Sequence, residues 1–304
     1  MNDQIRYQKS VQEALRDKRP VVALESTVIA HGLPYPKNYE TALELEEIIR
    51  AHGATPATIA VLDGTIRVGL SADELLRLAS CGQVLKLSSR DIAYALAQKK
   101  LGATTVSATM RIAAMADIFV FATGGIGGVH RDGHISFDVS ADLTELAQTP
   151  VTVVCAGAKS ILDLGRTLEY LETLAVPVIG FKTEQFPAFY SRTSGLSLSM
   201  HADSEDMCAA IIRHHRKLSP GGLVVAQPIP HEFELDALMV EQWIDVALLQ
   251  AQKEGIRGPK TTPFVLEYLF RISEGKTLVA NIALLKENAA LAARISKALV
   301  GYIE

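Results

Sequence analysis

Residues 151–165 read V-T-V-V-C-A-G-A-K-S-I-L-D-L-G, and this stretch decides the fold class. The apolar, β-branched run 151–155 is typical of a strand that is buried on both faces of a sheet. Small residues and one lysine, Lys159, follow it, and a helix is predicted from about Ser160 to Ala175. A buried strand that leads directly into a helix is the repeating unit of α/β proteins.

The same alternation continues on both sides of this stretch. A helix at 71–79 opens with Ser71 and Glu74 at the spacing of a capping box. From about Leu235 onward the pattern is only helical, with breaks at 255–259 and 274–276. Further strands are predicted at 21–24, 57–62, 84–87, 118–122, 177–181 and 223–226, and further helices at 40–49, 91–100 and from about residue 142. We therefore predict an α/β fold in which helices cover both faces of a mixed, largely parallel sheet, with a helical C-terminal region.

Composition restricts the class of protein. The 304 residues are 48% hydrophobic and 21% charged, and they contain no low-complexity linker or repeat, so we expect one globular domain over residues 1–304. The net charge of −4 gives no basic field, so neither nucleic acid nor a membrane is expected as a partner. The three cysteines lack C-x-x-C spacing and no apolar run reaches about 18 residues, which favours a cytoplasmic protein with reduced thiols.

Polar or glycine-rich segments follow several predicted strands. Ligands bind outside the carboxyl ends of strands in open α/β sheets, so these segments are candidates for a binding site. A single charged strand end is commonly just solvated and a single glycine commonly serves a turn, but five such ends together favour a ligand site. The five segments are Glu25–Thr27, 86–91, 123–130, Lys159 and 227–230.

The segment T123-G-G-I-G-G-V-H130 is rich in glycine. Only Gly125-x-Gly127 fits the dinucleotide-binding fingerprint, because His130 occupies the third glycine position, so that interpretation fails. Four glycines still allow backbone N–H groups to approach an anion closely, and His130 could add positive charge. A phosphate site and a plain turn both remain open from this segment alone.

The segment F137-D-V-S-A-D142 precedes a predicted helix. Asp138, Ser140 and Asp142 all lie near its N-terminus, where one of them is expected to cap the helix. The other aspartate could hold a hard cation such as Mg²⁺ or Mn²⁺ through one carboxylate and several waters. The sequence shows no histidine-rich or cysteine-rich ligand set, so a zinc site is not expected.

Lys159 is predicted at a helix N-terminus, where a positive charge is unfavourable. A lysine that acts as a nucleophile must lose its proton, and the helix terminus contributes at most about 2 kcal/mol toward this. Desolvation or a second cation such as Lys86 would have to supply the rest. The alternative is a lysine whose stem packs and whose ammonium group reaches solvent.

Taken together, the motifs resemble the pseudouridine-5'-phosphate glycosidase family, which includes indigoidine synthase A-like proteins. The resemblance extends from about Lys18 to near the C-terminus. It rests on long motifs in a fixed order, among them A23-L-E-S-T27, K86-L-S-S-R-D91, F121-A-T-G-G-I-G-G-V-H-R131, F137-D-V-S-A-D-L143, V153-V-C-A-G-A-K-S-I-L-D163 and N281-I-A-L284.

This resemblance implies a three-layer α/β/α sandwich, a homotrimer, and one divalent ion per subunit, typically Mn²⁺. The implied reaction is the reversible cleavage of pseudouridine 5'-phosphate with water to uracil and ribose 5-phosphate. The family's lysine nucleophile falls on Lys159 and its proton-donating glutamate on Glu25. Its metal-binding aspartate falls on Asp138, and its substrate-contacting positions on Lys86, Val106 and the run Ser140-Ala141-Asp142, with His130 as a phosphate contact and Asn281 as a uracil contact.

The chemistry explains why a lysine is required. Pseudouridine joins C1' of ribose to a carbon of uracil, so the easily protonated leaving atom of an ordinary glycoside is missing. A lysine that opens the ribose ring and forms an iminium at C1' makes this bond breakable. Two alternatives stay open: a class I aldolase-type enzyme that acts on a sugar phosphate, and a non-catalytic protein that binds a nucleotide or sugar phosphate. A role in an indigoidine pathway is also open.

Overall fold

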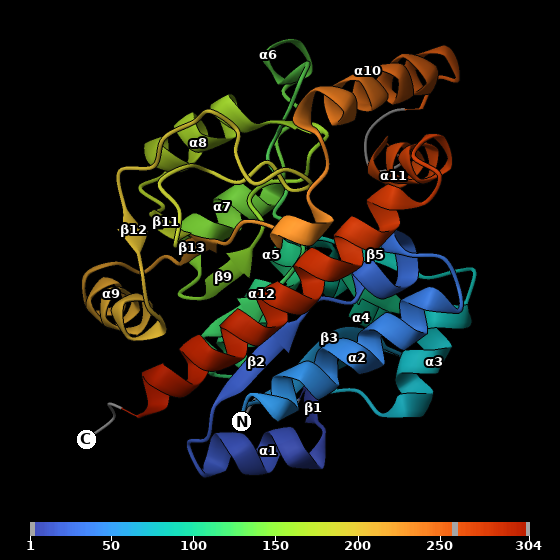
Figure 1. The fold of residues 1–304 in the computed structure, drawn as a ribbon. Coiled ribbons are helices and arrows are strands. Elements are labelled where there is room, and N and C mark those ends of the chain that lie inside the picture. Colours follow the sequence, from blue (N-terminus) through green and yellow to red (C-terminus); the bar gives the residue numbers. More distant parts are fainter. Residues whose placement is uncertain (1–3, 257–260, 302–304) are drawn as a thin grey trace.

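The computed structural model describes residues 4–256 and 261–301. A mixed sheet of eleven strands forms the centre of this part of the chain (Figure 1). Eight of its strand pairs are parallel, and β3 pairs antiparallel with β4 and β6. The spatial order is β1 (Ile5–Tyr7), β4 (Thr65–Val68), β3 (Thr55–Leu62), β2 (Val21–Leu24), β7 (Val120–Ala122), β9 (Thr152–Cys155), β13 (Leu223–Ala226), β11 (Val178–Phe181) and β12 (His201–Ala202), with β5 (Leu85–Leu87) and β6 (Gly102–Thr104) beside β3.

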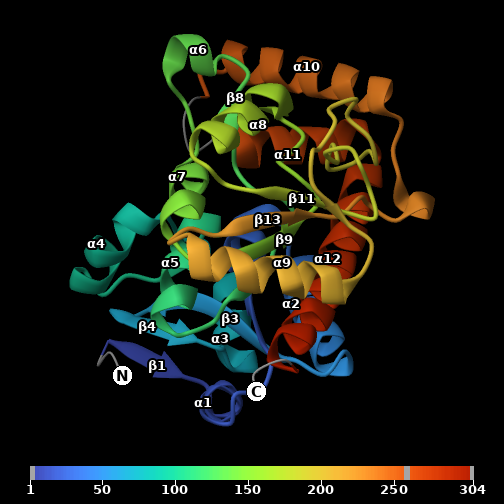
Figure 2. The same ribbon diagram turned by 90° about the vertical axis from the view of Figure 1, so that its left-hand side faces the viewer.

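Helices cover both faces of the sheet, which confirms the predicted three-layer sandwich (Figure 2). On one face, α12 (Lys276–Val300) lies across β2, β7 and β9 between α2 (Lys37–Ala51) and α9 (Glu205–Leu218). On the other face, α5 (Val106–Met115) packs on β2 and β3 and contacts α7 (Ala141–Gln148), which in turn contacts α8 (Leu164–Thr173). The remaining elements are α1 (Lys9–Arg16), α3 (Ala72–Ser80), α4 (Ile92–Ala97), α6 (Gly133–Ser136), α10 (Ala237–Lys253), α11 (Thr261–Ile272), the paired strands β8 (Val129–His130) and β10 (Leu162–Asp163), a π-helical turn (Val28–Gly32) and 3₁₀ turns at Ser89–Asp91 and His231–Phe233.

Local sequence accounts for most of these elements. Every residue of β2, β9, β11 and β13 is buried, as expected for continuous apolar runs in a parallel sheet with two covered faces. The predicted capping box of α3 is present, since Glu74 donates its backbone N–H to Ser71 Oγ at 3.2 Å and accepts that of Ser71 at 2.9 Å. Cys155 and Cys208 are buried free thiols, and Cys81 is an exposed one.

The junction after β9 differs from the prediction. No helix starts at Ser160, because α8 begins only at Leu164, where the Asp163 carboxylate accepts the N–H of Arg166 at 2.9 Å. Lys159 therefore lies in a loop, and the expectation that it sits at a helix N-terminus was wrong. The reason is non-local: Gly157 adopts φ +85°, and a β-carbon there would clash with the carbonyl oxygen of Pro187, so the chain turns tightly at a position that packs against a distant segment.

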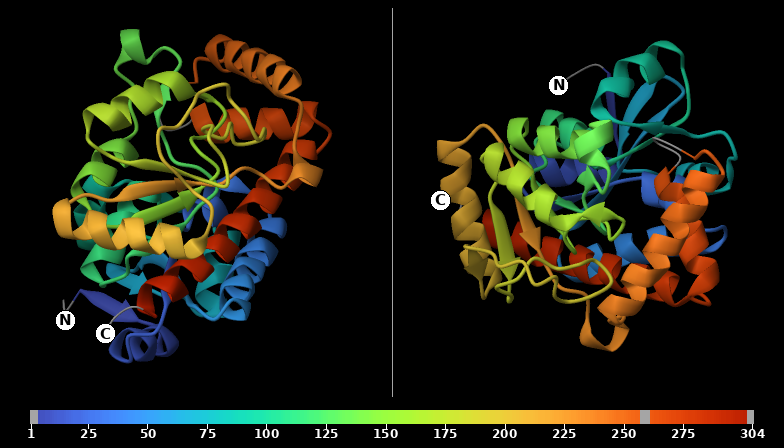
Figure 3. Two further views of the ribbon diagram at one scale, coloured as in Figure 1. Left: turned by 60° about the vertical axis from the view of Figure 1, so that its left-hand side comes forward. Right: turned by 90° about the horizontal axis from the view of Figure 1, so that it is seen from above.

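The predicted helical C-terminal region is confirmed by α10, α11 and α12. Helices α10 and α11 pack side by side at one end of the molecule, whereas α12 returns along the sheet (Figure 3). Gly275, at φ +83°, precedes α12 where the sequence predicts a break. The other predicted break, 255–259, lies mostly outside the described residues. No helix in the described ranges is long and apolar enough to cross a membrane.

The strand order places a switch point between β2 and β7. These two strands are parallel neighbours, but the chain leaves β2 toward β3 on one side and leaves β7 toward β9 on the other. Ligand sites in open α/β sheets lie at such a point, outside the carboxyl ends of the strands. The residues that follow β2 and β7 are therefore the first place to look for a site.

Candidate active site

A cavity of about 430 Å³ opens at the carboxyl ends of the central strands, within the usual range of roughly 300–1,000 Å³ for small-molecule sites. Of the ten predicted site residues, Val106 does not line the cavity: its side chain is 1% exposed, although its neighbours Thr105 and Ser107 do line it. The other nine, which the fold brings together there, are Glu25, Lys86, His130, Asp138, Ser140, Ala141, Asp142, Lys159 and Asn281.

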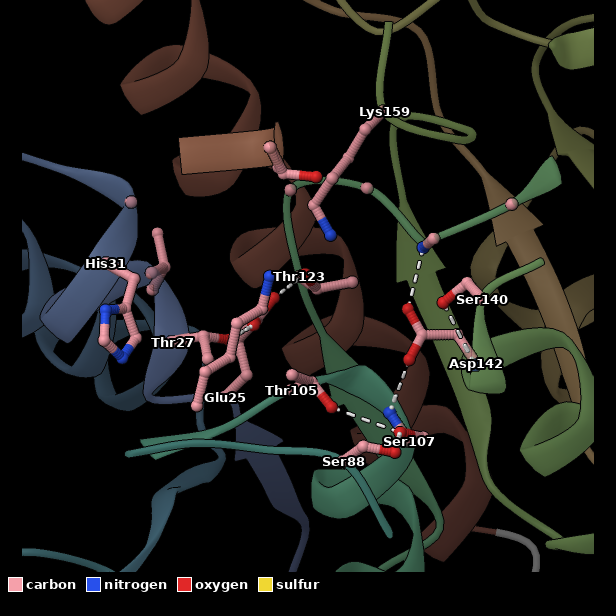
Figure 4. A pocket seen from close by; sticks show the side chains of 18 of the residues that line it. Glu25, Thr27, His31, Ser88, Thr105, Ser107, Thr123, Ser140, Asp142 and Lys159 are labelled. Carbon is pink, nitrogen blue, oxygen red and sulfur yellow. Dashed lines mark hydrogen bonds between the residues drawn. The ribbon is translucent and has the colours of Figure 1, made fainter. Parts of the chain in front are cut away.

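Glu25 follows β2 and is 8% exposed. Two hydroxyl groups donate to its carboxylate, Thr27 Oγ1 to Oε2 and Thr123 Oγ1 to Oε1 (Figure 4). Thr123 follows β7, and its carbonyl accepts Asn288 Nδ2 of α12 at 2.9 Å. The switch point and the covering helix thus fix the position of the glutamate from both sides.

Lys159 extends into the cavity toward Thr123, with Glu25 and His31 on one side of the view and Asp142 on the other (Figure 4). Lys86 enters from β5. The side chain of Lys86 borders the cavity, but surrounding protein atoms still desolvate its ammonium group. This desolvation is the larger cause that lowers the pKa of Lys86, and the positive charge of Lys159 is the second. The carboxylates of Glu25 and Asp142 act in the opposite direction. Two cations therefore share the cavity with the buried glutamate.

Asp142 ties the glycine-rich loop to the start of α5. Its Oδ2 accepts the N–H of Gly127 at 2.8 Å, and its Oδ1 accepts that of Ser107 at 2.9 Å. Ser140 is the N-cap of α7, and its Oγ accepts the N–H of Asp142 at 3.2 Å. Both carboxylate oxygens of Asp142 thus bind backbone N–H groups, so the predicted substrate contact is a carboxylate that also orders the loop.

Several polar residues line the cavity that sequence reasoning had not selected individually. Ser88 and Ser107 lie with their Oγ atoms 3.5 Å apart, and Ser107 Oγ is 3.1 Å from Thr105 Oγ1. Hydroxyl groups at the start of α5 are suitable donors to a phosphate. His31, from the π-helical turn after β2, is half-buried, and desolvation together with the positive charge of Lys86 lowers its pKa. Ser88 belongs to segment 86–91 after a predicted strand, which was its sequence signal, whereas Ser107 lies in a helix that the sequence analysis had not predicted.

Asp138 offers one carboxylate for a metal ion. Its side chain is 43% exposed and lines the cavity, and its Oδ2 lies 3.9 Å from His130 Nε2. The described residues contain no group of three or more His, Cys, Asp or Glu side chains arranged to hold a metal. This donor set fits a hard, hydrated cation held by one carboxylate with water or ligand oxygens, and it does not fit a zinc cage.

The fold and the site together define an α/β protein that binds a small, polar or anionic molecule at the carboxyl edge of its sheet. Comparison with known proteins narrows this class. Residues 10–298 match the family model described as indigoidine synthase A like protein, and the chain belongs to this family.

The chain is 53% identical over 297 residues to the pseudouridine-5'-phosphate glycosidase of Caldanaerobacter subterraneus subsp. tengcongensis, which covers 97% of both proteins. It is 52% identical over 300 residues to the enzyme of the same name from Geobacillus kaustophilus, covering 98% of this chain and 100% of the relative. Its structure is similar to that of the prealnumycin C-glycosynthase AlnA in complex with ribulose 5-phosphate, with a TM-score of 0.92, 39% identity and coverage of 99% and 98%. An indigoidine synthase A-like protein from Thermotoga maritima gives a TM-score of 0.89 at 36% identity, covering 97% and 96%.

Proposed function

We propose that this chain is a pseudouridine-5'-phosphate glycosidase, which reversibly cleaves pseudouridine 5'-phosphate with water to uracil and ribose 5-phosphate. The observation that carries the proposal is the convergence of Lys159, Lys86 and the hydroxyl-bonded Glu25 on one cavity at the switch point. The names of relatives that are more than 50% identical support the substrate, and the ribulose 5-phosphate complex of AlnA supports a sugar-phosphate site.

The proposed reaction uses Lys159 as the nucleophile. Its Nζ attacks C1' and displaces the ring oxygen, which takes up a proton from solvent as the ribose opens. The attacking nitrogen gives a proton to the Glu25 carboxylate and so regains its lone pair. The nitrogen lone pair then forms the C1'=N bond as the C1'–C5 bond breaks, and Glu25 donates a proton to C5 of the departing uracil. Water adds to C1' of the iminium, which releases ribose 5-phosphate, restores the amine and returns one proton to solvent. Lys86, the 124–128 loop and Ser140 would bind the phosphate and so position C1'.

Trapping with borohydride tests this proposal. The enzyme is mixed with Mn²⁺ and pseudouridine 5'-phosphate, quenched with borohydride and analysed by peptide mass spectrometry while free uracil is measured. We expect a ribose-phosphate adduct on Lys159 together with released uracil, and neither in a folded Lys159→Ala variant. Aldehyde products from a sugar phosphate, without uracil from pseudouridine 5'-phosphate, would favour the aldolase-type alternative. No adduct, uracil or aldehyde product with wild-type protein would favour a non-catalytic binding protein.

We also propose that Asp138 holds one Mn²⁺ ion per subunit. When bound, such an ion supplies positive charge that orients water and phosphate oxygens. Because the remaining ligands would be water or substrate, removal of the ion should lower activity but leave the melting temperature nearly unchanged. Titration with Mn²⁺ followed by electron paramagnetic resonance measures binding directly. Asp138→Asn should lose the bound ion, and equal binding by this variant would place the ion elsewhere.

We further propose that the protein acts in the cytoplasm as a homotrimer of one-domain subunits. Exposed apolar side chains near α6 and on α10 support self-association, including Phe137 at 85% and Leu238 at 76% exposure. Sedimentation equilibrium should give three times the mass of the chain. A monomeric mass at micromolar concentration would contradict the trimer.

A further inference from the structure

The hydroxyl of Thr27 lies between two acceptors. Its Oγ1 is within hydrogen-bond distance of Glu25 Oε2 and, at 3.0 Å, of the backbone carbonyl oxygen of Thr104. A threonine hydroxyl carries one hydrogen, so in a two-centre bond it donates to only one of these acceptors at a time. Thr27 is 7% exposed and Thr104 is fully buried, so each of these polar groups depends on a protein partner.

The second acceptor is held in place by a buried network. The Thr104 carbonyl also accepts the N–H of Ser26 at 3.3 Å, while the N–H of Thr104 donates to Ser26 Oγ at 2.9 Å. Thr104 Oγ1 donates to the carbonyl of Ile59 at 2.7 Å and accepts Thr109 Oγ1 at 2.9 Å. The carbonyl therefore remains available to Thr27 whichever way the Thr27 hydroxyl points.

Counting hydrogens shows what this arrangement does for Glu25. When the carboxylate is ionised, Thr27 and Thr123 can each donate to one of its oxygens. When Oε2 carries a proton, it can donate to Thr27 Oγ1, whose own hydrogen then turns to the Thr104 carbonyl. Every hydrogen retains a partner in both states. Thr123 has no second acceptor among the described residues and donates to Oε1 in both states. Because a hydrogen bond to a charged oxygen is the stronger one, the Thr123 hydroxyl favours the ionised form.

We propose that Thr27 is a positioning residue that serves both protonation states of Glu25 by turning its hydroxyl between Oε2 and the Thr104 carbonyl. The inference rests on the proposed function, in which Glu25 carries a proton. The proton on Glu25 comes from the reacting groups and leaves to uracil C5. No bond of Thr27 breaks, because its hydrogen only rotates about the C–O bond. Thr123, in contrast, stabilises the ionised form more than the protonated form.

Isosteric variants separate the two threonines. Thr27→Val removes a partner from both states of Glu25, so kcat should fall by about 10- to 100-fold while the acid limb of the pH profile of kcat/KM barely moves. Thr123→Val removes a bond that is stronger in the ionised form than in the protonated form, so its acid limb should move to higher pH. Thr27→Ser keeps the hydroxyl and should restore near wild-type rates.

The variants leave all other charged groups of the cavity unchanged, so the comparison isolates Glu25. These groups are His31, Lys86, Arg90, Asp91, His130, Asp138, Asp142 and Lys159. A Thr27→Val acid limb that shifts as far as that of Thr123→Val would overturn the proposal, and so would a wild-type kcat in Thr27→Val. Thermal melting checks folding, and Thr27→Ala replaces the valine variant if that one does not fold.

An infrared titration gives a readout that does not depend on turnover. The carboxyl band of Glu25 is identified with ¹³C-labelled glutamate by its absence in Glu25→Gln, and its protonation is followed with pH. We expect an unchanged midpoint in Thr27→Val and a higher midpoint in Thr123→Val. Failure of the wild-type protein to release uracil would overturn the proposed function, whereas equal midpoint shifts in the two variants would overturn the role of Thr27.

Discussion

Lys86 on β5 and Lys159 in the loop after β9 reach one cavity, and their positive charges repel each other. This repulsion, after desolvation, lowers the pKa of Lys86. The sequence argument had named Lys86 as a second cation near Lys159, and the fold brings the two lysines to one cavity. It does so without the helix terminus that the sequence had suggested, because Lys159 lies in a loop ahead of α8.

The coupling between these lysines predicts the effect of Lys159→Met. Removal of the Lys159 charge should raise the pKa of Lys86 toward its ordinary value, but desolvation remains and should keep it lower. Titration of ¹³Cε-labelled lysines by nuclear magnetic resonance measures this change. Lys286→Met, which alters a lysine paired with Glu44 at 2.7 Å, is the control and should leave Lys86 unchanged. An unmoved Lys86 in Lys159→Met would show that the two charges do not interact.

The same shift has a consequence for stability. A lowered lysine pKa means that the folded state binds this proton more weakly than the unfolded state does. Lys86 therefore destabilises the folded state at pH values below its lowered pKa. This destabilisation decreases as the pH rises from that pKa and is gone above the pKa that Lys86 has in the unfolded chain. Between these two pKa values, the free energy of unfolding should depend less on pH in Lys159→Met than in the wild-type protein.

Among the elements, the loop after β7 shows how close packing shapes the site. A β-carbon on Gly127 would lie 2.6 Å from Asp142 Oδ2 and closer still to Ser140 Oγ. Gly127→Ala should therefore displace the loop and break the bond from its N–H to Asp142. A bond to a charged group contributes about 1.5–3 kcal/mol, so we expect kcat/KM to fall by about 10- to 100-fold.

Uracil release measures this effect. Gly82→Ala is the matched control, because a β-carbon there meets no heavy atom within 4 Å and the residue lies outside the cavity. It should keep wild-type activity. If Gly127→Ala were as active as Gly82→Ala, the bond between Gly127 and Asp142 would have no role in the site.

For the whole molecule, α12 is the helix that joins the layers to the site. It packs on β2, β7 and β9, and its Leu291 is fully buried. Leu291→Ala should lower the free energy of unfolding by about 2–5 kcal/mol, because it leaves a cavity in the core. Val279→Ala changes a residue of the same helix that is 54% exposed, and it should cost less than about 0.5 kcal/mol. Urea unfolding compares the two, and equal losses would contradict the burial of α12.

The sequence by itself predicted seven strands of the central sheet and the two candidate catalytic residues. Continuous apolar runs predicted these strands, the Ser71–Glu74 box predicted the start of α3, and long motifs singled out Glu25 and Lys159 as candidates. Helix α5 and strands β4 and β6 were not predicted. The features that were predicted depend on local periodicity and on residue chemistry, both of which can be read along the chain.

Only the tertiary structure decided which groups meet. Thr123 binds Glu25 from 98 residues away, and Asn288 fixes Thr123 from 165 residues away. The packing of Gly157 against Pro187 placed Lys159 in a loop, and no local pattern indicated that α12 would cross the sheet beside the site. Such contacts depend on how distant segments fill the same space, and hydrophobic periodicity shows only that a segment is buried, without showing which partner buries it.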